Sequence, residues 1–177
     1  SQCIDLVEPK WIINAAAYTS VDAAENDTDQ AAAVNTAAPA VLAAICAQRG
    51  IRLVHVSTDF VFDGMAKTPY LPSAKTSPLG VYGETKLGGE RAVIASGASH
   101  VIIRTSWLYA PGGRNFVCTM LRLMRDHGGV RVVSDQIGSP TSASGLAKVC
   151  WALALHPEAS GIFHWSDFGA ISWYEFA

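Results

Sequence analysis

The stretch IRLVHVST, residues 51–58, decides the fold, because it is rich in apolar and β-branched residues and ends in two hydroxyl side chains. Runs of this kind favour β-strands. Comparable runs recur along the chain, at residues 11–18, 100–109, 130–133 and 161–165. Strands that are continuously apolar are typical of a parallel sheet covered on both faces. We therefore expect these runs to be the strands of one such sheet.

Helical segments lie between most of the expected strands. We expect four, at about residues 28–48, 81–95, 115–126 and 142–155. The first begins at an N-cap pair, Thr28 and Asp29, and ends at Gly50. Pro39 should bend this helix, because it removes the hydrogen bond to the carbonyl of Asn35. Alternating strands and helices predict an α/β fold with a doubly wound parallel sheet, a Rossmann-like architecture.

The composition limits the classes of protein to consider. The chain has 177 residues, half of them hydrophobic, and a formal net charge of −2, so it can bury one sizeable core. It has no basic tract, so we expect no nucleic-acid partner. Its longest apolar run is short and broken by polar residues, so we expect no membrane span. Its first ten residues lack the pattern of a signal peptide.

Four cysteines are widely scattered, with no CxxC pair and no histidine at ligand spacing: Cys3, Cys46, Cys118 and Cys150. This spacing argues against a disulfide framework and against a zinc site. We interpret the cysteines as reduced, mostly buried thiols of a cytoplasmic protein.

Tyr82 and Lys86 lie four residues apart in an expected helix, so they share one face. A phenol has an ordinary pKa of roughly 10, and an adjacent ammonium lowers it by favouring the phenolate. The pair is therefore a candidate proton donor or acceptor. The same spacing also occurs by chance on solvated helix faces, so both interpretations stay open here.

Two strand ends give this pair a context. The strand that begins at Ile51 is followed without a break by Ser57, Thr58 and Asp59, and ligands of an open α/β sheet gather at the carboxyl ends of its strands. The Thr58 hydroxyl could bind the same substrate oxygen as the tyrosine. The first expected strand ends in small residues, where a flat ligand could approach the backbone: Ala15, Ala16 and Ala17. A strand-end cap and simple packing are the competing explanations.

Six blocks, taken in order, carry a family resemblance: NAAAYTSVDAAE (14–25), VNTAAPAVL (34–42), VHVSTDFVFDG (54–64), SPLGVYGETKLGGE (77–90), IIRTSWLYAPGGRNFVCTMLRL (102–123) and VVSDQIGSPTSASGLA (132–147). Through nearly its whole length the chain closely resembles the dTDP-4-dehydrorhamnose reductase family, which are extended short-chain dehydrogenase/reductases. The segments STDFVFDG and DQIGSPT are far more specific than the tyrosine–lysine spacing.

This resemblance implies a reaction, the reduction by NADPH or NADH of the 4-keto group of dTDP-4-dehydro-L-rhamnose. The product would be dTDP-L-rhamnose, a precursor of bacterial cell-surface polysaccharide. The resemblance implies that Tyr82 gives a proton to the C4 oxygen and that Thr58 binds that oxygen. It implies that Lys86 lowers the pKa of the tyrosine and holds the nicotinamide ribose.

The resemblance also assigns binding residues. Five residues would line the cofactor: Ala15, Ala16, Ala17, Tyr18 and Thr19. Ser57 would touch the nicotinamide side, and Asn35 would anchor a relay water or satisfy the helix bend. Asp59 and Trp107 would contact the sugar, while Asn115 and Gln136 would lie toward the nucleotide. An indole is a rigid apolar platform that suits a deoxysugar, although Trp107 could equally be a core tryptophan.

The sequence departs from the family pattern at several places. The first glycine is Gly50, so the Gly-rich turn that holds the cofactor pyrophosphate is missing. We expect the chain to begin inside the fold, to end before the substrate domain is complete, and to be inactive by itself. Ser144 stands where some members carry a glutamate of a metal-bridged dimer, so we expect no metal, and Mg²⁺ is doubtful. Gly80 stands where an asparagine is expected.

These considerations define the expected organisation. Residues 1–110 would form a cofactor-binding Rossmann-like domain, and residues 111–177 would combine part of a smaller substrate domain with returning Rossmann elements. The expected partner is a dTDP-sugar, and a homodimer is compatible with the family. Two alternatives stay open. One is a non-catalytic regulator of the same fold, like the regulatory subunit of methionine adenosyltransferase. The other is a nucleotide-sugar epimerase or dehydratase, which would retain tightly bound NAD.

Overall fold

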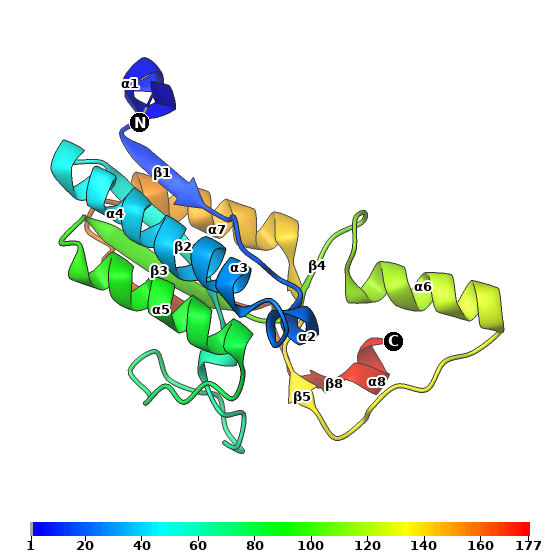
Figure 1. Ribbon diagram of the computed structural model, residues 1–177. Helices are drawn as coiled ribbons and strands as arrows, with labels where there is room; N and C mark the ends of the chain where they lie inside the picture. Colours follow the sequence, from blue (N-terminus) through cyan, green and yellow to red (C-terminus); the bar gives the residue numbers. More distant parts are fainter. Residues whose placement is uncertain (1) are drawn as a thin grey trace. The chain divides into compact units, whose positions relative to one another are not determined.

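The computed structural model describes residues 2–177, with side chains from residue 4 onward (Figure 1). The chain divides into two compact units, and each is described by itself. The first contains residues 1–104 and 150–164, and the second contains residues 105–149 and 165–177.

A four-stranded parallel sheet forms the centre of the first unit. Its strands follow the order β1-β2-β3-β7, with bounds Trp11–Asn14, Arg52–Thr58, His100–Thr105 and Gly161–His164. Strand β1 pairs in parallel with β2, and β3 with β7. The apolar residues of β2 and β3 are buried, including Leu53, Val54, Ile102 and Ile103. The sheet confirms the predicted α/β fold class.

Helices cover this sheet on both faces (Figure 1). Helix α4 (Ala38–Arg49) and helix α5 (Val81–Ala95) pack against each other and against β2. On the other side, helix α7 (Ala143–Leu155) brings Trp151 into an edge contact with Trp11 of β1, with ring centroids 4.5 Å apart. Short helices α1 (Gln2–Val7), α2 (Val21–Ala24) and α3 (Thr28–Ala32) precede α4.

The expected helix over residues 28–48 is α3, a π-helical turn η1 (Ala33–Ala37) and α4. The π turn lies directly before Pro39, which is consistent with the carbonyl of Asn35 having lost its usual helical donor. Gly50 ends α4 with a φ of 64°, as expected. The N-cap is Asp27, one residue before the predicted pair.

The segment Thr28–Arg49 corrects one expectation. By length and composition alone it is the one stretch of the described residues that could cross a membrane. Our expectation that every apolar run is too short was therefore wrong on length. In this fold the segment packs one face against the rest of the unit, and Ala43 and Cys46 of that face lie in a core cluster with Leu53 and Ile102.

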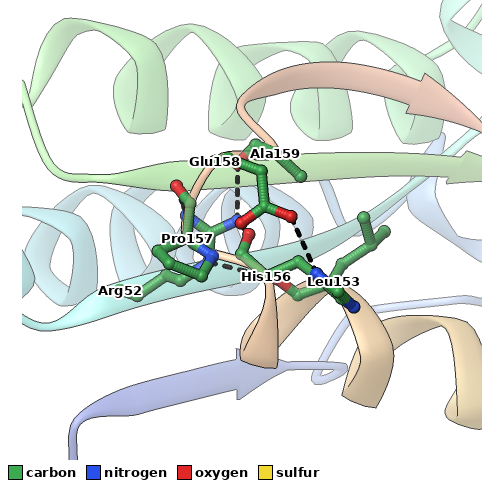
Figure 2. Close-up of polar contacts among 6 residues, drawn as sticks. All are labelled: Arg52, Leu153, His156, Pro157, Glu158 and Ala159. Carbon is green, nitrogen blue, oxygen red and sulfur yellow. Dashed lines mark hydrogen bonds and ion pairs between the residues drawn. The ribbon is translucent and has the colours of Figure 1, made fainter.

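A buried arginine joins the end of α7 to β2 (Figure 2). The Arg52 guanidinium donates to the carbonyl oxygens of Leu153, His156, Pro157 and Ala159, at 2.5 to 3.2 Å, and to the Ser99 hydroxyl at 3.1 Å. The last carbonyls of a helix have no partner within the helix. Arg52 supplies these carbonyls and those of the turn to β7 with donors.

The second unit is built from short elements. Strand β4 (Leu108–Tyr109) pairs in parallel with β6 (Thr141–Ser142), and β5 (Ile137–Gly138) pairs antiparallel with β8 (Ile171–Ser172). Helix α6 (Phe116–His127) and helix α8 (Trp173–Phe176) complete it. Ser172 and Glu175 form a capping box at the start of α8.

Three strand predictions need correction. The run 100–109 is divided into β3 and β4, because the chain bends at Trp107, whose φ is 47°. The run 130–133 forms no strand. Its β-branched residues have no neighbouring strand to pair with, and β-propensity depends on such packing. Strand β1 is also shorter than predicted, since it ends at Asn14.

Candidate active site

Helix α5 carries Tyr82 and Lys86 and begins at a crowded turn. The Val81 N–H donates to the Glu25 carboxylate at 2.8 Å, so Glu25 caps this helix from a distant part of the chain. A Cβ at Gly80 would lie 2.6 Å from the same carboxylate oxygen. The glycine that departs from the expected asparagine therefore makes room for this cap.

Helix α5 also lies very close to the π turn η1. A Cβ at Gly89 would collide with the Asn35 carbonyl oxygen, and one at Gly88 would lie 2.7 Å from the Thr36 hydroxyl oxygen. Thr36 in turn donates to the Thr85 carbonyl at 2.7 Å. The glycines allow α5 and η1 to pack in direct contact, and this contact fixes the position of α5 along η1.

Asn35 is almost fully buried and uses its whole side-chain amide. Its oxygen accepts from the Tyr18 N–H at 2.9 Å, and its nitrogen donates to the Tyr18 carbonyl at 3.1 Å and the Thr85 hydroxyl at 3.2 Å. These bonds tie the loop after β1 to α5. The two roles predicted for Asn35, a relay-water anchor and a partner for the helix bend, stay predictions.

Thr58 ends β2 and begins the short 3₁₀ helix η2 (Asp59–Val61). Its hydroxyl donates to the Asp59 carboxylate at 3.1 Å and accepts from the Phe60 N–H at 3.2 Å. The Phe60 ring meets Tyr82 edge to face, with centroids 5.4 Å apart. The strand end and the start of α5 thus come together at one place, as predicted for Thr58, Asp59 and Tyr82.

The pKa of the Tyr82 phenol is raised above its ordinary value. Burial is the main cause, the Asp59 charge adds to it, and a hydrogen bond with Thr58 acts in the opposite direction. Burial also raises the pKa of Asp59. Tyr82 is therefore protonated near neutral pH, which is the state a proton donor needs.

Lys86 is buried, and its ammonium donates to the Val56 carbonyl at 2.7 Å. Burial lowers the pKa of Lys86 to about 8, although the nearby Glu90 charge raises it. The His55 imidazole lies behind it, with its Nδ1 3.1 Å from the Asn14 amide nitrogen. Burial and the Lys86 charge lower the pKa of His55 to about 3, so His55 is neutral at the working pH.

Ser57 takes part in a buried network that sequence reasoning missed. Its hydroxyl donates to the Glu90 carboxylate at 2.5 Å, and Glu90 forms an ion pair with Arg104 at 2.7 Å. The sequence shows Glu90 one helical turn after Lys86, and it shows Arg104 as a charged residue within an apolar strand. Neither feature indicates that Glu90 and Arg104 contact each other.

The loop that follows β1 presents small residues, with Ala15, Ala16 and Thr19 exposed and Ala17 and Tyr18 half-buried. The Ala16 N–H donates to the Asn14 side chain at 3.2 Å. These predicted cofactor residues lie in the first unit together with Ser57, Thr58, Tyr82 and Lys86.

The other predicted substrate residues belong to the second unit. Trp107 stacks on Trp173, with ring centroids 3.5 Å apart, and its indole lies against the backbone of Gly138. Asn115 is the N-cap of α6: its side chain accepts from the Cys118 N–H at 3.1 Å and donates to the carbonyls of Ala110 and Gly112. Gln136 is exposed in the turn before β5.

Metal binding finds no support in the side chains that the structure describes. Among them no three His, Cys, Asp or Glu residues gather as a metal site would require. Ser144 lies in the first turn of α7. Cys46, Cys118 and Cys150 are free thiols, and Cys3 lies outside the described side chains.

A parallel sheet with a hydroxyl at one strand end, and a tyrosine and a lysine one turn apart on the following helix, defines the class of extended short-chain dehydrogenase/reductases. A family model described as the RmlD substrate binding domain matches residues 1–177. The chain belongs to this dTDP-4-dehydrorhamnose reductase (RmlD) family.

Individual relatives agree with this assignment. The chain is 41% identical to dTDP-4-dehydrorhamnose reductase of Shigella flexneri over 182 residues, which cover all of this chain and 60% of that protein. It is 45% identical to dTDP-4-keto-6-deoxy-D-glucose reductase of Streptomyces niveus, over 98% of this chain and 60% of that protein. The chain thus spans about 60% of the length of these relatives.

A solved structure matches the fold closely. The crystal structure of dTDP-4-dehydrorhamnose reductase from Bacillus anthracis in complex with NADP has a TM-score of 0.95 to this chain at 38% identity. The match covers 99% of this chain and 62% of that one. It confirms the Rossmann-like extended architecture predicted from the sequence.

Proposed function

We propose that the whole protein reduces the 4-keto group of dTDP-4-dehydro-L-rhamnose to give dTDP-L-rhamnose, using NADPH or NADH. The observation that carries the proposal is the meeting of Thr58, at the end of β2, with Tyr82 on α5, in a chain of this family. Membership alone would not suffice, because one fold supports many functions.

Each residue has a role in this proposal. Tyr82 gives its phenol proton to the C4 oxygen, and Thr58 holds that oxygen through its hydroxyl. Lys86 stabilises the phenolate that remains. Asp59, whose carboxylate accepts a hydrogen bond from Thr58, would also accept one from a sugar hydroxyl. Tyr82 acts by general acid catalysis, which contributes typically about 10² to 10⁴ in rate.

The residues present fit the nicotinamide-ribose half of the cofactor. An ammonium has three N–H donors, and Lys86 directs one of them to Val56, so the others can meet ribose hydroxyls. The exposed small residues Ala15 and Ala16 allow a flat ring to approach the backbone. When bound, NADPH or NADH supplies the hydride that reduces the carbonyl.

A single assay tests the proposal. The full-length protein is mixed with dTDP-4-dehydro-L-rhamnose and NADPH or NADH, and the absorbance at 340 nm is followed. Loss of absorbance together with formation of dTDP-L-rhamnose supports the proposal. A regulatory relative would show no turnover. An epimerase or dehydratase would be purified with bound NAD and would turn over without consuming added NADPH.

The Streptomyces niveus relative motivates a second substrate, dTDP-4-keto-6-deoxy-D-glucose. The two sugars both carry a 4-keto group, and they differ in configuration at C3 and C5, the ring carbons on either side of that group. A competition assay with equal concentrations of both gives the ratio of their kcat/KM values directly. We propose the rhamnose precursor as the preferred substrate, a cytoplasmic site of reaction, and a homodimer as the assembly.

A further inference from the structure

Lys86 and Glu90 lie one helical turn apart on α5, at the spacing where a lysine and a glutamate commonly form an ion pair. In this structure the two side chains have other partners. The Lys86 ammonium donates to the Val56 carbonyl at 2.7 Å. The Glu90 carboxylate receives its hydrogen bonds from Ser57 and Arg104. The sequence spacing favours one pairing, and the fold imposes another.

The Arg104 guanidinium occupies both oxygens of the Glu90 carboxylate. Its Nε donates to Oε1 at 2.9 Å and its Nη2 donates to Oε2 at 2.7 Å. The Ser57 hydroxyl donates the third hydrogen bond of the carboxylate, also to Oε1. Glu90 is 1% exposed and Arg104 is 4% exposed. A two-pronged contact of this kind fixes both direction and distance. Little of the carboxylate is left for a second cation.

Arg104 is itself held from the opposite side. Its Nη1 donates to the Pro72 carbonyl at 3.2 Å, and the guanidinium lies 5.1 Å from the centre of the Phe62 ring. Phe62 stacks on Tyr70 at 4.3 Å. The long loop over residues 63–79 therefore keeps the arginine directed at Glu90.

The groups around Lys86 leave its ammonium without an ion-pair partner. Arg104 balances the buried charge of Glu90, and His55 is neutral because its pKa is about 3. Tyr82, which shares the Lys86 face of α5, is protonated. Without Arg104 the only buried cation within reach of Glu90 on the same helix face would be Lys86.

We propose that Arg104 is a positioning residue that keeps Glu90 from capturing Lys86, so that the lysine ammonium stays on the Val56 carbonyl and remains available to the active site. Ser57 shares this task, because its hydroxyl donates to the Glu90 carboxylate. The catalytic meaning of the proposal rests on the proposed function. Its electrostatic part concerns residues of this chain alone.

The electrostatic part is tested by NMR without any substrate. In ¹³C- and ¹⁵N-labelled full-length protein, the Lys86 side-chain shift is followed against pH and assigned with Lys86→Arg. In Arg104→Met the unbalanced Glu90 should raise the Lys86 pKa by about one unit or more. In the double variant Arg104→Met/Glu90→Gln, which is again balanced, the pKa should return to within about half a unit of the parent. An unchanged pKa in the single variant overturns the proposal.

The catalytic part uses kcat and the cofactor KM of the same proteins. Arg104→Met should lower kcat about tenfold or more, and the double variant should recover to within about threefold of the parent. A double variant that is no better than the single one means that Arg104 only supports the fold, and it overturns the proposal. If the parent itself does not reduce the sugar nucleotide, the proposed function fails while the NMR result still decides the electrostatic claim.

Two further variants keep the test decisive. Arg52 is a buried arginine of the same sheet whose hydrogen-bond partners are carbonyls (Figure 2) and the Ser99 hydroxyl. Arg52→Met should therefore lower the melting temperature without moving the Lys86 pKa. If Arg104→Met does not fold, Arg104→Lys replaces it, since it keeps a cation beside Glu90. A shift of the Lys86 pKa below half a unit in Arg104→Lys supports the proposal, and a larger one overturns it.

Discussion

The side chain of Asn35 holds the backbone of Tyr18 by both its N–H, at 2.9 Å, and its C=O, at 3.1 Å. The same amide reaches Thr85 on α5 at 3.2 Å. A loop that would lie against the cofactor is thereby fastened to the helix that carries Tyr82 and Lys86. The two halves of the candidate site are connected through one buried residue.

This connection predicts the effect of removing the Asn35 amide. Asn35→Leu, similar in size, leaves the Tyr18 backbone groups and Thr85 without their partner, and each unsatisfied buried group costs about 1–3 kcal/mol. We expect lower stability in urea unfolding and a higher cofactor KM, with a smaller change in the sugar KM. Thr36→Val, which removes the neighbouring bond to α5, is the matched control, and it should leave the cofactor KM unchanged. Equal effects on both KM values would contradict the assignment.

Tyr82 as the proton donor leads to a second prediction. Tyr82→Phe removes the hydroxyl and keeps the ring against Phe60, so the fold should be retained. In the full-length protein kcat should fall by about 10² to 10⁴. Steady-state rates at 340 nm measure this, and a circular dichroism melt checks the fold. Activity within about threefold of the parent would remove Tyr82 from the mechanism.

Gly80 provides a test of the cap on α5. Gly80→Ala places a Cβ 2.6 Å from the Glu25 carboxylate oxygen and pushes it away from the Val81 N–H. Loss of a helix N-cap costs about 1 kcal/mol, so we expect a slightly lower melting temperature. Gly50→Ala is unsuitable as a control because its φ of 64° adds strain. Gly112→Ala, with open space around the Cβ, is suitable. A Gly80→Ala protein as stable as the parent would show that Glu25 contributes nothing.

Trp107 stays a predicted sugar contact, although its indole stacks on Trp173 in this structure. As a sugar platform, Trp107→Ala should raise the sugar KM far more than the cofactor KM. As a structural residue it should mainly lower the melting temperature, as Trp173→Ala would. Comparing these two variants by thermal melting and by the two KM values separates the roles. A pure stability loss in both would end the platform hypothesis.

The sequence was most informative where local pattern and tertiary packing agree. Helix α5 has the predicted bounds, because a turn at Gly80 precedes it and its buried face faces the sheet. The pattern could not reveal that Glu90 pairs with Arg104 across two elements, since periodicity shows which face is buried and not which charges meet there. Nor could the pattern reveal that the Asn115 side chain is the N-cap of α6, and the nucleotide contact that the family resemblance implies for Asn115 stays a prediction. Side chains suited to ligands are equally suited to helix ends.

The last prediction concerns pH and His55, whose pKa falls from 6.5 to about 3 on burial. The unfolded chain therefore binds a proton on this histidine between about pH 6.5 and 3 that the folded chain does not bind. The contribution of His55 to folding stability consequently falls as the pH is lowered through this window, at up to about 1.4 kcal/mol per pH unit, and this contribution does not change above pH 7. Lys86 keeps its charge throughout, because its pKa is about 8.

Urea unfolding at pH 7, 6, 5 and 4.5 measures this dependence in the parent and in His55→Gln. The variant removes the titrating group and keeps an acceptor for the Asn14 amide. Other groups titrate in both proteins, so the difference between the two curves isolates the histidine. We expect the parent to lose stability more steeply than His55→Gln below pH 6.5. Parallel curves of stability against pH would mean that His55 becomes protonated in the folded protein as it does in the unfolded chain. The strand that carries His55 beneath Lys86 would then be accessible to water.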